Sequence, residues 1–126
     1  MIQLTEEMRS LINNARSNGT PCILASASPD GVPNAGYRGT VMVFDDASLA
    51  YRERGTPVEH LEENPRGVVL YFDAGRQVGW KFRCTATVYR EGPIYQQVMD
   101  GLAALGLIQD PVTASAAVVL RVDQVL

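Results

Sequence analysis

Three observations predict a mostly β fold whose antiparallel strands close, or nearly close, into a barrel. Six apolar runs have the length and residue types of strands, and most are bounded by turn residues. The connections between the early runs are too short for the crossover helices of a parallel sheet. Residues 1–126, of which 46% are hydrophobic, have the size of a single domain, and closure would remove exposed sheet edges.

The first third of the chain is expected to form a helix followed by a hairpin. Thr5 can cap a helix with one apolar stripe at helical spacing, and Asn18-Gly19 is expected to end it. A strand is predicted over residues 21–28. The turn sequence Pro-Asp-Gly-Val-Pro, residues 29–33, joins it to a second strand over residues 35–44. The two strands should therefore pair as a hairpin.

The middle third is expected to hold two strands and a short helix. Asp45-Asp46 forms a tight turn before a short strand over residues 48–52. A helix should run from Thr56 to about Glu63, where Asn64-Pro65 stops it. The continuous apolar run 67–72 predicts a strand that is buried on both faces.

The last third contains the clearest alternating strand of the sequence. The side chains at even positions from Trp80 to Val88 would share one face, and those at odd positions from Lys81 to Tyr89 the other. Gly92-Pro93 should open a third helix, and a final strand is expected over residues 116–122. The predicted order is helix, three strands, short helix, two strands, helix and strand.

Charge and cysteine content exclude several classes of protein. The formal net charge of −3 argues against a nucleic-acid or anionic-membrane partner, because both require a basic surface. No apolar run is long enough to span a membrane, and the polar N-terminus lacks a signal sequence. Cys22 and Cys84 should be buried, reduced thiols, with a disulfide as the less favoured alternative. We therefore expect a cytoplasmic protein.

The sequence offers no self-contained metal or hydrolase chemistry. His60, the single histidine, lies among glutamates of the short helix, so neither a metal cluster nor a nucleophile with its base is expected. No Walker A or G-x-G-x-x-G motif occurs. Redox or group-transfer chemistry would therefore require a bound cofactor.

An anion site is predicted where Arg52 and Arg54 run into the short helix. Thr56 is the candidate N-cap, Pro57 the first helical residue, and Glu59 would complete a capping box. Helix N-termini offer free N–H groups, and guanidinium groups match phosphate oxygens. The pattern therefore favours the phosphate of a nucleotide-like cofactor. The alternative is a capped helix that binds nothing, with both arginines in solvent.

Four segments carry a resemblance to a known family. They are Asp30-Gly31-Val32-Pro33, Tyr37-Arg38-Gly39-Thr40-Val41, Leu49-Ala50-Tyr51-Arg52 and His60-Leu61-Glu62-Glu63-Asn64-Pro65-Arg66-Gly67-Val68-Val69-Leu70. The last resembles the run (N/H)-L-x-x-N-P-x-(V/A)-x-L of the FMN-binding split barrels in the pyridoxamine 5′-phosphate oxidase-like group. The order and spacing of these segments, across most of the chain, carry the resemblance.

The resemblance implies a six-stranded antiparallel split β-barrel of the Greek-key type with two or three flanking helices. It also implies a homodimer with FMN bound between the subunits. The implied cofactor-binding residues are Arg38, Gly39, Thr40 and Val41 along the flavin, and Tyr51, Arg52, Arg54 and Thr56 around the phosphate. Further candidates are Trp80 or Tyr37 beside the flavin ring and Lys81 reaching across the dimer. The alternatives are core packing for Trp80 and a solvated face for Lys81.

The implied function is that of an FMN-dependent oxidoreductase that transfers electrons or hydride to or from a small-molecule substrate. The oxidases carry a Ser-Arg-Lys triplet where this chain has Gly55-Thr56-Pro57, which disfavours oxidation of pyridoxamine phosphate itself. Three alternatives remain open: a flavin-binding module without turnover, a structural dimeric barrel, and a split barrel that binds a deazaflavin or haem.

Overall fold

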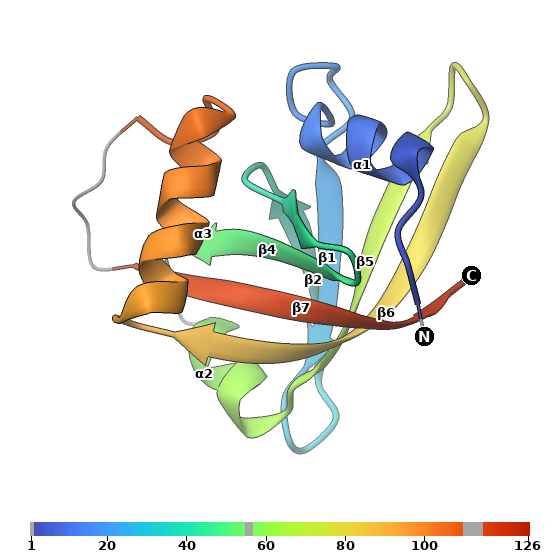
Figure 1. Cartoon of the computed structure of the whole chain (residues 1–126). Coiled ribbons are helices and arrows are strands. Elements are labelled where there is room, and N and C mark those ends of the chain that lie inside the picture. The colour runs from blue at the N-terminus through green and yellow to red at the C-terminus, as the bar shows by residue number, and fades with distance from the viewer. Residues whose placement is uncertain (1, 55–56, 110–114) are drawn as a thin grey trace.

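The computed structural model describes residues 2–54, 57–109 and 115–126, and these residues form one curved sheet with three helices around it (Figure 1). The helices are α1 (Glu6–Asn13), α2 (Pro57–Glu63) and α3 (Pro93–Ala104). The strands are β1 (Cys22–Ala27), β2 (Pro33–Arg38), β3 (Met42–Asp45), β4 (Ser48–Glu53), β5 (Arg66–Asp73), β6 (Val78–Tyr89) and β7 (Ala116–Val125). None of the helices within the described residues is long and apolar enough to cross a membrane.

The described part of the chain contains seven strands, so the predicted count of six was wrong by one. The run 35–44 splits at Gly39-Thr40: β2 pairs with β1, and β3 pairs with β4. A glycine weakens a strand interior, and the Thr40 hydroxyl accepts a hydrogen bond from the Arg52 N–H at 3.0 Å, which fixes the bend. The chain therefore leaves one edge of the sheet and joins the other within three residues.

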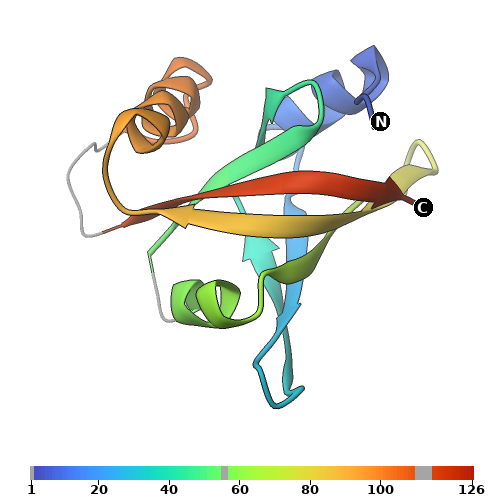
Figure 2. The ribbon, with the colours of Figure 1, turned by 60° about the horizontal axis from the view of Figure 1, so that its bottom comes forward.

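The strand order β2-β1-β5-β6-β7-β4-β3 explains how this sheet forms a split barrel. All its pairs are antiparallel, as predicted. The two edge strands, β2 and β3, are joined directly by residues 39–41 and are not hydrogen-bonded to each other in the strand order. A covalent link of three residues, in place of hydrogen bonds between strands, therefore connects the two edges of the barrel. Figure 2 shows the same strongly curved sheet from a second direction.

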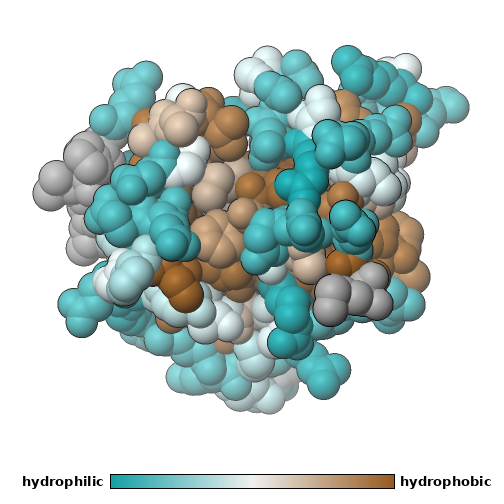
Figure 3. All heavy atoms as spheres, viewed as in Figure 1, coloured by the Kyte–Doolittle hydropathy of each residue, from teal (hydrophilic) through white to brown (hydrophobic). Residues whose placement is uncertain are grey.

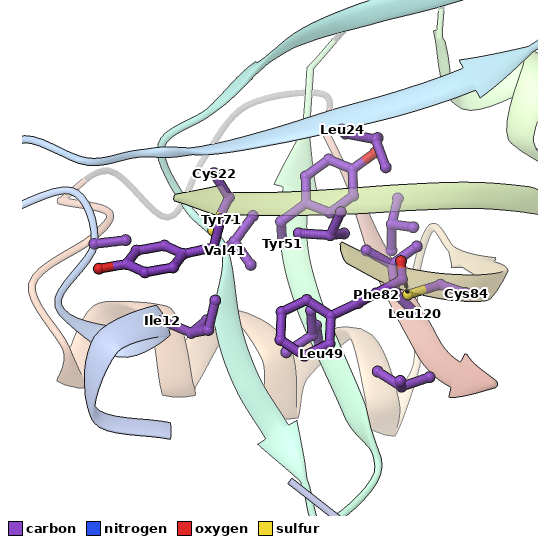
Figure 4. Close-up of a cluster of buried hydrophobic side chains, with 14 of the residues drawn as sticks. Ile12, Cys22, Leu24, Val41, Leu49, Tyr51, Tyr71, Phe82, Cys84 and Leu120 are labelled. Atoms are coloured by element: carbon purple, nitrogen blue, oxygen red, sulfur yellow. Dashed lines mark hydrogen bonds between the residues drawn. The ribbon is translucent and has the colours of Figure 1, made fainter. Parts of the chain in front are cut away.

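The interior of the barrel is filled by side chains from nearly every strand. Tyr51, Phe82, Leu49 and Leu120 are fully buried and point into this interior (Figure 4). Leu11 and Ile12 of α1 belong to the same cluster, so α1 covers one end of the barrel. Burying each of these large apolar side chains contributes about 1.5–3 kcal/mol.

The two cysteines are free and buried, which confirms the prediction of reduced interior thiols. Burial raises the pKa of the Cys22 thiol to about 12, because a thiolate is disfavoured away from water. Burial, together with the nearby Asp123 carboxylate, also raises the pKa of Cys84 to about 12. Both thiols are therefore neutral near pH 7.

The helix starts were predicted better than the helix ends. The Thr5 hydroxyl caps α1 by accepting a hydrogen bond from the Met8 N–H at 3.1 Å. The helix ends at Asn13, however, and the chain runs through turns to Gly19, which has a positive φ of 76°. In α3, Pro93 is the first residue and Gly106 lies just past the end, as expected.

Helix α3 packs outside the barrel, against β3, β4 and β7. Its Val98, Met99 and Leu102 are buried with Met42 and Ala117 in a second apolar cluster. Figure 3 shows apolar atoms gathered in the middle of this face of the molecule, where a hollow between α3 and β3 is lined by Met42, Phe44 and Leu105 among others.

The prediction that residues 67–72 are buried on both faces was wrong. Val69 and Tyr71 are fully buried, but Leu70 is 37% exposed and Phe72 is 58% exposed. The strand β5 alternates between the barrel interior and an outer face that none of the described helices covers. The alternation predicted for Trp80–Tyr89 is confirmed, with the Phe82, Cys84 and Ala86 side chains on the buried face.

Candidate functional site

A cavity of about 570 Å³ lies where β2 leaves the sheet and β4 ends. We call it the arginine pocket. Its described lining residues are Arg16, Tyr37, Arg38, Gly39, Thr40, Arg52, Glu53, Arg54, Gly106, Leu107, Ile108 and Gln109. Four of them are arginines and one is a carboxylate, so the charge of the lining is positive although the whole chain has a formal net charge of −3.

The split of the barrel brings these residues together. Arg38 is the last residue of β2, whereas Arg52 and Arg54 lie at the end of β4, at the other side of the sheet. The short link through Gly39 and Thr40 places both strand ends beside each other. The Thr40 hydroxyl accepts from the Arg52 N–H at 3.0 Å, which ties the link to β4.

A buried ion pair organises the base of the pocket. Arg38 Nε donates to Glu53 Oε1 at 3.1 Å, and the two side chains are only 15% and 11% exposed. The Tyr51 hydroxyl donates to the same oxygen at 3.2 Å, and the Arg54 N–H donates to Oε2 at 3.1 Å. The Arg38 guanidinium also lies 5.9 Å from the centre of the Tyr51 ring. The orientation of Arg38 is therefore fixed by its neighbours.

Tyr51 is a neutral donor in this arrangement. Burial raises the pKa of its hydroxyl above the ordinary value, the Glu53 carboxylate raises it further, and Arg38 opposes both effects. The Tyr51 proton thus stays in place to donate to Glu53. Three donors satisfy this buried carboxylate, which is the condition under which a buried charge is tolerated.

Arg16 was missed by the sequence analysis. It follows α1, and its Nη1 donates to the Leu107 carbonyl at 2.8 Å, so it links the region after α1 to the segment after α3. It also lies against the link between β2 and β3, since a Cβ atom on Gly39 would be 3.6 Å from Arg16 Cδ. No local pattern marks such a residue, because its partners lie far away in the sequence.

The structure brings together five of the ten predicted cofactor-binding residues in the arginine pocket. These are Arg38, Gly39, Thr40, Arg52 and Arg54. Val41 and Tyr51 adjoin the pocket in sequence, but their side chains are buried in the barrel core. Thr56 lies outside the described residues, so its capping box with Glu59 stays a prediction.

The remaining two predicted residues, Trp80 and Lys81, do not line the pocket of their own chain. The centre of the Trp80 ring lies 5.9 Å from that of the Tyr71 ring and 6.1 Å from that of the Phe82 ring, which agrees with the alternative of core packing. Lys81 is exposed on the outer face of β6. Its backbone pairs with Leu126, so only the side chain is available to a ligand.

Metal chemistry finds no support in the described part of the chain. No group of three or more His, Cys, Asp or Glu side chains gathers there in a way that could hold a metal ion. His60 is exposed on α2, which has seven residues in the structure. The positive charge of the candidate site therefore comes from arginine side chains.

Fold and cavity together define a split β-barrel protein with a basic, partly apolar pocket beside the split. The chain belongs to the pyridoxamine 5′-phosphate oxidase family, whose model matches residues 4–125. No curated protein matches the chain in sequence.

Three solved structures illustrate the range of proteins that share this fold. A variant of HupZ from Group A Streptococcus is 25% identical, with a TM-score of 0.79 over 100% of this chain and 98% of that chain. An FMN-binding protein related to pyridoxamine 5′-phosphate oxidase, from Nostoc punctiforme, is 12% identical, with a TM-score of 0.68 over 98% and 84%. HutZ, the haem storage protein of Vibrio cholerae, is 15% identical, with a TM-score of 0.68 over 98% and 92%.

Proposed function

We propose that this protein binds FMN in the arginine pocket and uses it to transfer electrons, as hydride, to or from a small-molecule substrate. The observation that carries the proposal is the set of four arginines around one cavity, whose charge is only partly offset by one carboxylate. Arginine is the side chain best suited to a phosphate group, because its planar guanidinium can donate two parallel hydrogen bonds. Membership of the family and an FMN-binding neighbour support the choice of cofactor.

The size and composition of the pocket fit a mononucleotide. Its volume of about 570 Å³ lies within the range of roughly 300–1,000 Å³ that small-molecule sites occupy. Leu107 and Ile108 line it with little exposed surface, and the Tyr37 ring, 71% exposed at the margin, adds an apolar face. A ligand with a dianionic end and a flat apolar ring would thus find both kinds of surface.

The residues of the chain would divide the work of holding such a ligand. Arg52 and Arg54 would bind the phosphate, while Glu53 keeps Arg38 in a fixed orientation beside them. Tyr37, an exposed lining residue, would cover one side of the flavin ring. When bound, FMN supplies the hydride chemistry at its N5 atom, so the protein contributes orientation and electrostatics.

The proposed assembly is a homodimer formed through that end of the outer face of β1, β2 and β5 which carries Tyr37, Ile23, Leu70 and Phe72. Tyr37, Ile23 and Leu70 lie side by side on adjacent strands in direct register, and Phe72 continues the row along β5. Tyr37 is 71% exposed and Phe72 58% exposed. An exposed patch of large apolar residues is typical of an interaction surface. Lys81, paired with Leu70, would then face the partner subunit.

The choice of a flavin in preference to haem is supported by the small number of possible iron ligands in the pocket. Haem iron requires an axial ligand such as histidine, cysteine, methionine or tyrosine. Among the described lining residues, Tyr37 is the only side chain of these types. A deazaflavin would use the same phosphate-binding arginines, so it is distinguished from FMN by titration.

The proposal is tested by comparing FMN with riboflavin, which has the same ring but no phosphate. Fluorescence titration should show that FMN binds more tightly than riboflavin to the wild-type protein. The double variant Arg52→Ala, Arg54→Ala should weaken FMN binding by about 2 kcal/mol, roughly 30-fold, because charge-assisted hydrogen bonds are lost. Riboflavin affinity should change little. A parallel titration with a deazaflavin ranks the two cofactors.

Arg9→Ala is the matched control, since Arg9 pairs with Asp46 on the surface and does not line the pocket. It should leave both affinities unchanged. Equal binding of FMN and riboflavin, or unchanged FMN affinity in the double variant, would place the phosphate elsewhere and contradict the proposal.

A further inference from the structure

We propose that the outer face of β5, β6 and β7 carries a second anion-binding site, which takes a small organic molecule with a dianionic group on an apolar body. The site is an open groove of about 990 Å³, which we call the outer groove. Its described lining residues are Ala25, Ser26, Ala27, Asn64, Arg66, Gly67, Val68, Arg83, Cys84, Thr85, Arg121, Asp123 and Gln124. It shares none of these residues with the arginine pocket.

The strand register gathers three arginines in this groove. Arg66, Thr85 and Arg121 lie directly opposite one another on β5, β6 and β7. Arg83 lies two residues before Thr85 on the same face of β6, and it is therefore a diagonal neighbour of both other arginines. Like charges so close on one sheet face repel each other. A bound anion would remove that repulsion.

One carboxylate within the groove offsets only part of this charge. Arg121 Nε lies 3.0 Å from Asp123 Oδ1, and the Thr85 hydroxyl donates to Asp123 Oδ2 at 2.5 Å. These hydrogen bonds, that of Thr85 first, lower the pKa of Asp123, which is therefore ionised at neutral pH. The charge of the described lining is thus positive by two on a chain whose formal net charge is −3.

The other two arginines keep donors available. Arg83 Nη1 donates to the neutral Gln124 side chain at 3.1 Å, which leaves its charge uncompensated. Arg66 is exposed, and its guanidinium makes no hydrogen bond or ion pair with any residue that the structure describes. Both can therefore turn their remaining N–H groups toward a ligand in the groove.

A β-bulge and small residues shape the groove. The register between β6 and β7 shifts at Arg83 and Cys84, so Asp123 is an extra residue that has no direct partner. Ala25 and Val68 lie opposite each other on β1 and β5, and Val68 lies opposite Arg83, so small apolar side chains adjoin the arginines in the groove. Polar groups beside small apolar side chains suit a ring that carries a phosphate or two carboxylates.

The site is tested with phenyl phosphate and phthalate, which carry a phosphate or two carboxylates on the same apolar ring. Titration of the ¹⁵N-labelled full chain should move the backbone amide signals of Val68, Thr85 and Gln124 in a saturable way. The variant Arg66→Gln, Arg83→Gln should weaken this binding at least about tenfold, since both removed charges face the ligand. The two probes show which dianion is preferred.

Arg76→Gln is the matched control, because Arg76 is exposed at the β5–β6 turn and lines neither cavity. It should bind both probes as the wild type does. Arg66 and Arg83 are exposed, so their variants should keep the folded amide spectrum, which the same experiment verifies.

The amide signals also separate this site from the arginine pocket. Shifts confined to Thr40 and Arg52 would mean that the probes bind only the pocket, and they would overturn the proposal. Equal shifts with benzyl alcohol, which is neutral, would show that the groove binds the apolar ring without regard to charge, and they would also contradict the proposal. Because each site reports through its own residues, failure of FMN to bind leaves the result for the outer groove readable.

Discussion

At the scale of single residues, Arg38 has a structural role as well as a proposed role in binding. Its guanidinium is held by Glu53 and lies over the Tyr51 ring, and both members of the ion pair are more than four-fifths buried. Removing one partner of a buried pair leaves the other charge without compensation. Loss of Arg38 would therefore change both folding and ligand binding, so a variant of Arg38 does not isolate its proposed role in binding.

Arg38→Met should lower the free energy of unfolding by about 3–5 kcal/mol, because the Glu53 carboxylate is left buried without its cation. Adding Glu53→Gln should recover part of that loss, since a neutral amide tolerates burial better. Urea unfolding of the two single variants and the double variant measures both effects.

Arg9→Met serves as the reference for an exposed pair, because Asp46 is 80% exposed. Breaking that pair should cost about 1 kcal/mol or less. If Arg38→Met is no more destabilising than Arg9→Met, the pair at the base of the pocket does not hold the fold together.

The residues of the candidate site were predictable only where local sequence marks them. Arg52 and Arg54 precede a helix start, which is a recognisable local signal for an anion. Glu53 lies between them, yet its pairing with Arg38 depends on a contact across the split of the barrel. Arg16 likewise reaches Leu107 through tertiary folding, 91 positions away. Such partners follow from the topology and leave no trace in spacing.

At the scale of elements, the two errors in the predicted strands concern how strands relate to the sheet. The run 35–44 is apolar enough for one strand, but its halves pair with different neighbours, which hydrophobic pattern cannot reveal. The run 67–72 is continuous in hydrophobicity, yet only one of its faces is buried in the chain. The hydrophobic character of its exposed side chains, Leu70 and Phe72, is explained if a second subunit covers them.

Phe72→Asp should convert the proposed dimer into a monomer at micromolar concentration, because a carboxylate buried at an apolar interface loses its hydration. The side chain is 58% exposed in the protomer, so the substitution should leave the fold intact. Sedimentation equilibrium of wild type and variant measures the change in association.

Val32→Asp is the control for this experiment, since Val32 is 59% exposed but lies in the β1–β2 turn, away from the row on β5. It should leave the association constant unchanged. Wild-type association of Phe72→Asp would show that the outer face of β5 is not the contact between subunits.

At the scale of the whole molecule, the fold class was largely accessible from sequence. Short apolar runs, tight turns and the order of helices and strands predicted an antiparallel split barrel, and the strand pairing and family match confirm it. Function is harder to read, because the same fold occurs in an FMN-binding protein and a haem storage protein. The side chains that line the cavity, and not the fold, distinguish one ligand from another.

The proposed function predicts that the purified protein is yellow and that its flavin absorption bleaches when a nicotinamide donor is added anaerobically. Arg52 and Arg54 would retain the cofactor through purification, and the donor would provide the hydride. Absorption spectroscopy before and after addition of the donor measures both properties.

The other outcomes of this experiment identify the alternative classes. A yellow protein that no nicotinamide donor reduces would be a flavin-binding module without this turnover. Colourless protein that also fails to bind added FMN would leave only a structural role for the barrel.

Because β2 and β3 are not hydrogen-bonded to each other, a ligand in the arginine pocket would affect the local stability of the barrel. The pocket is lined by the ends of β2 and β4 and by the segment after α3, which meet there from three directions. A molecule that binds all three segments would connect the two sides of the barrel where no strand pairing joins them. Part of its binding free energy would then oppose local unfolding between β2 and β3. Without a ligand, local unfolding would begin in this region.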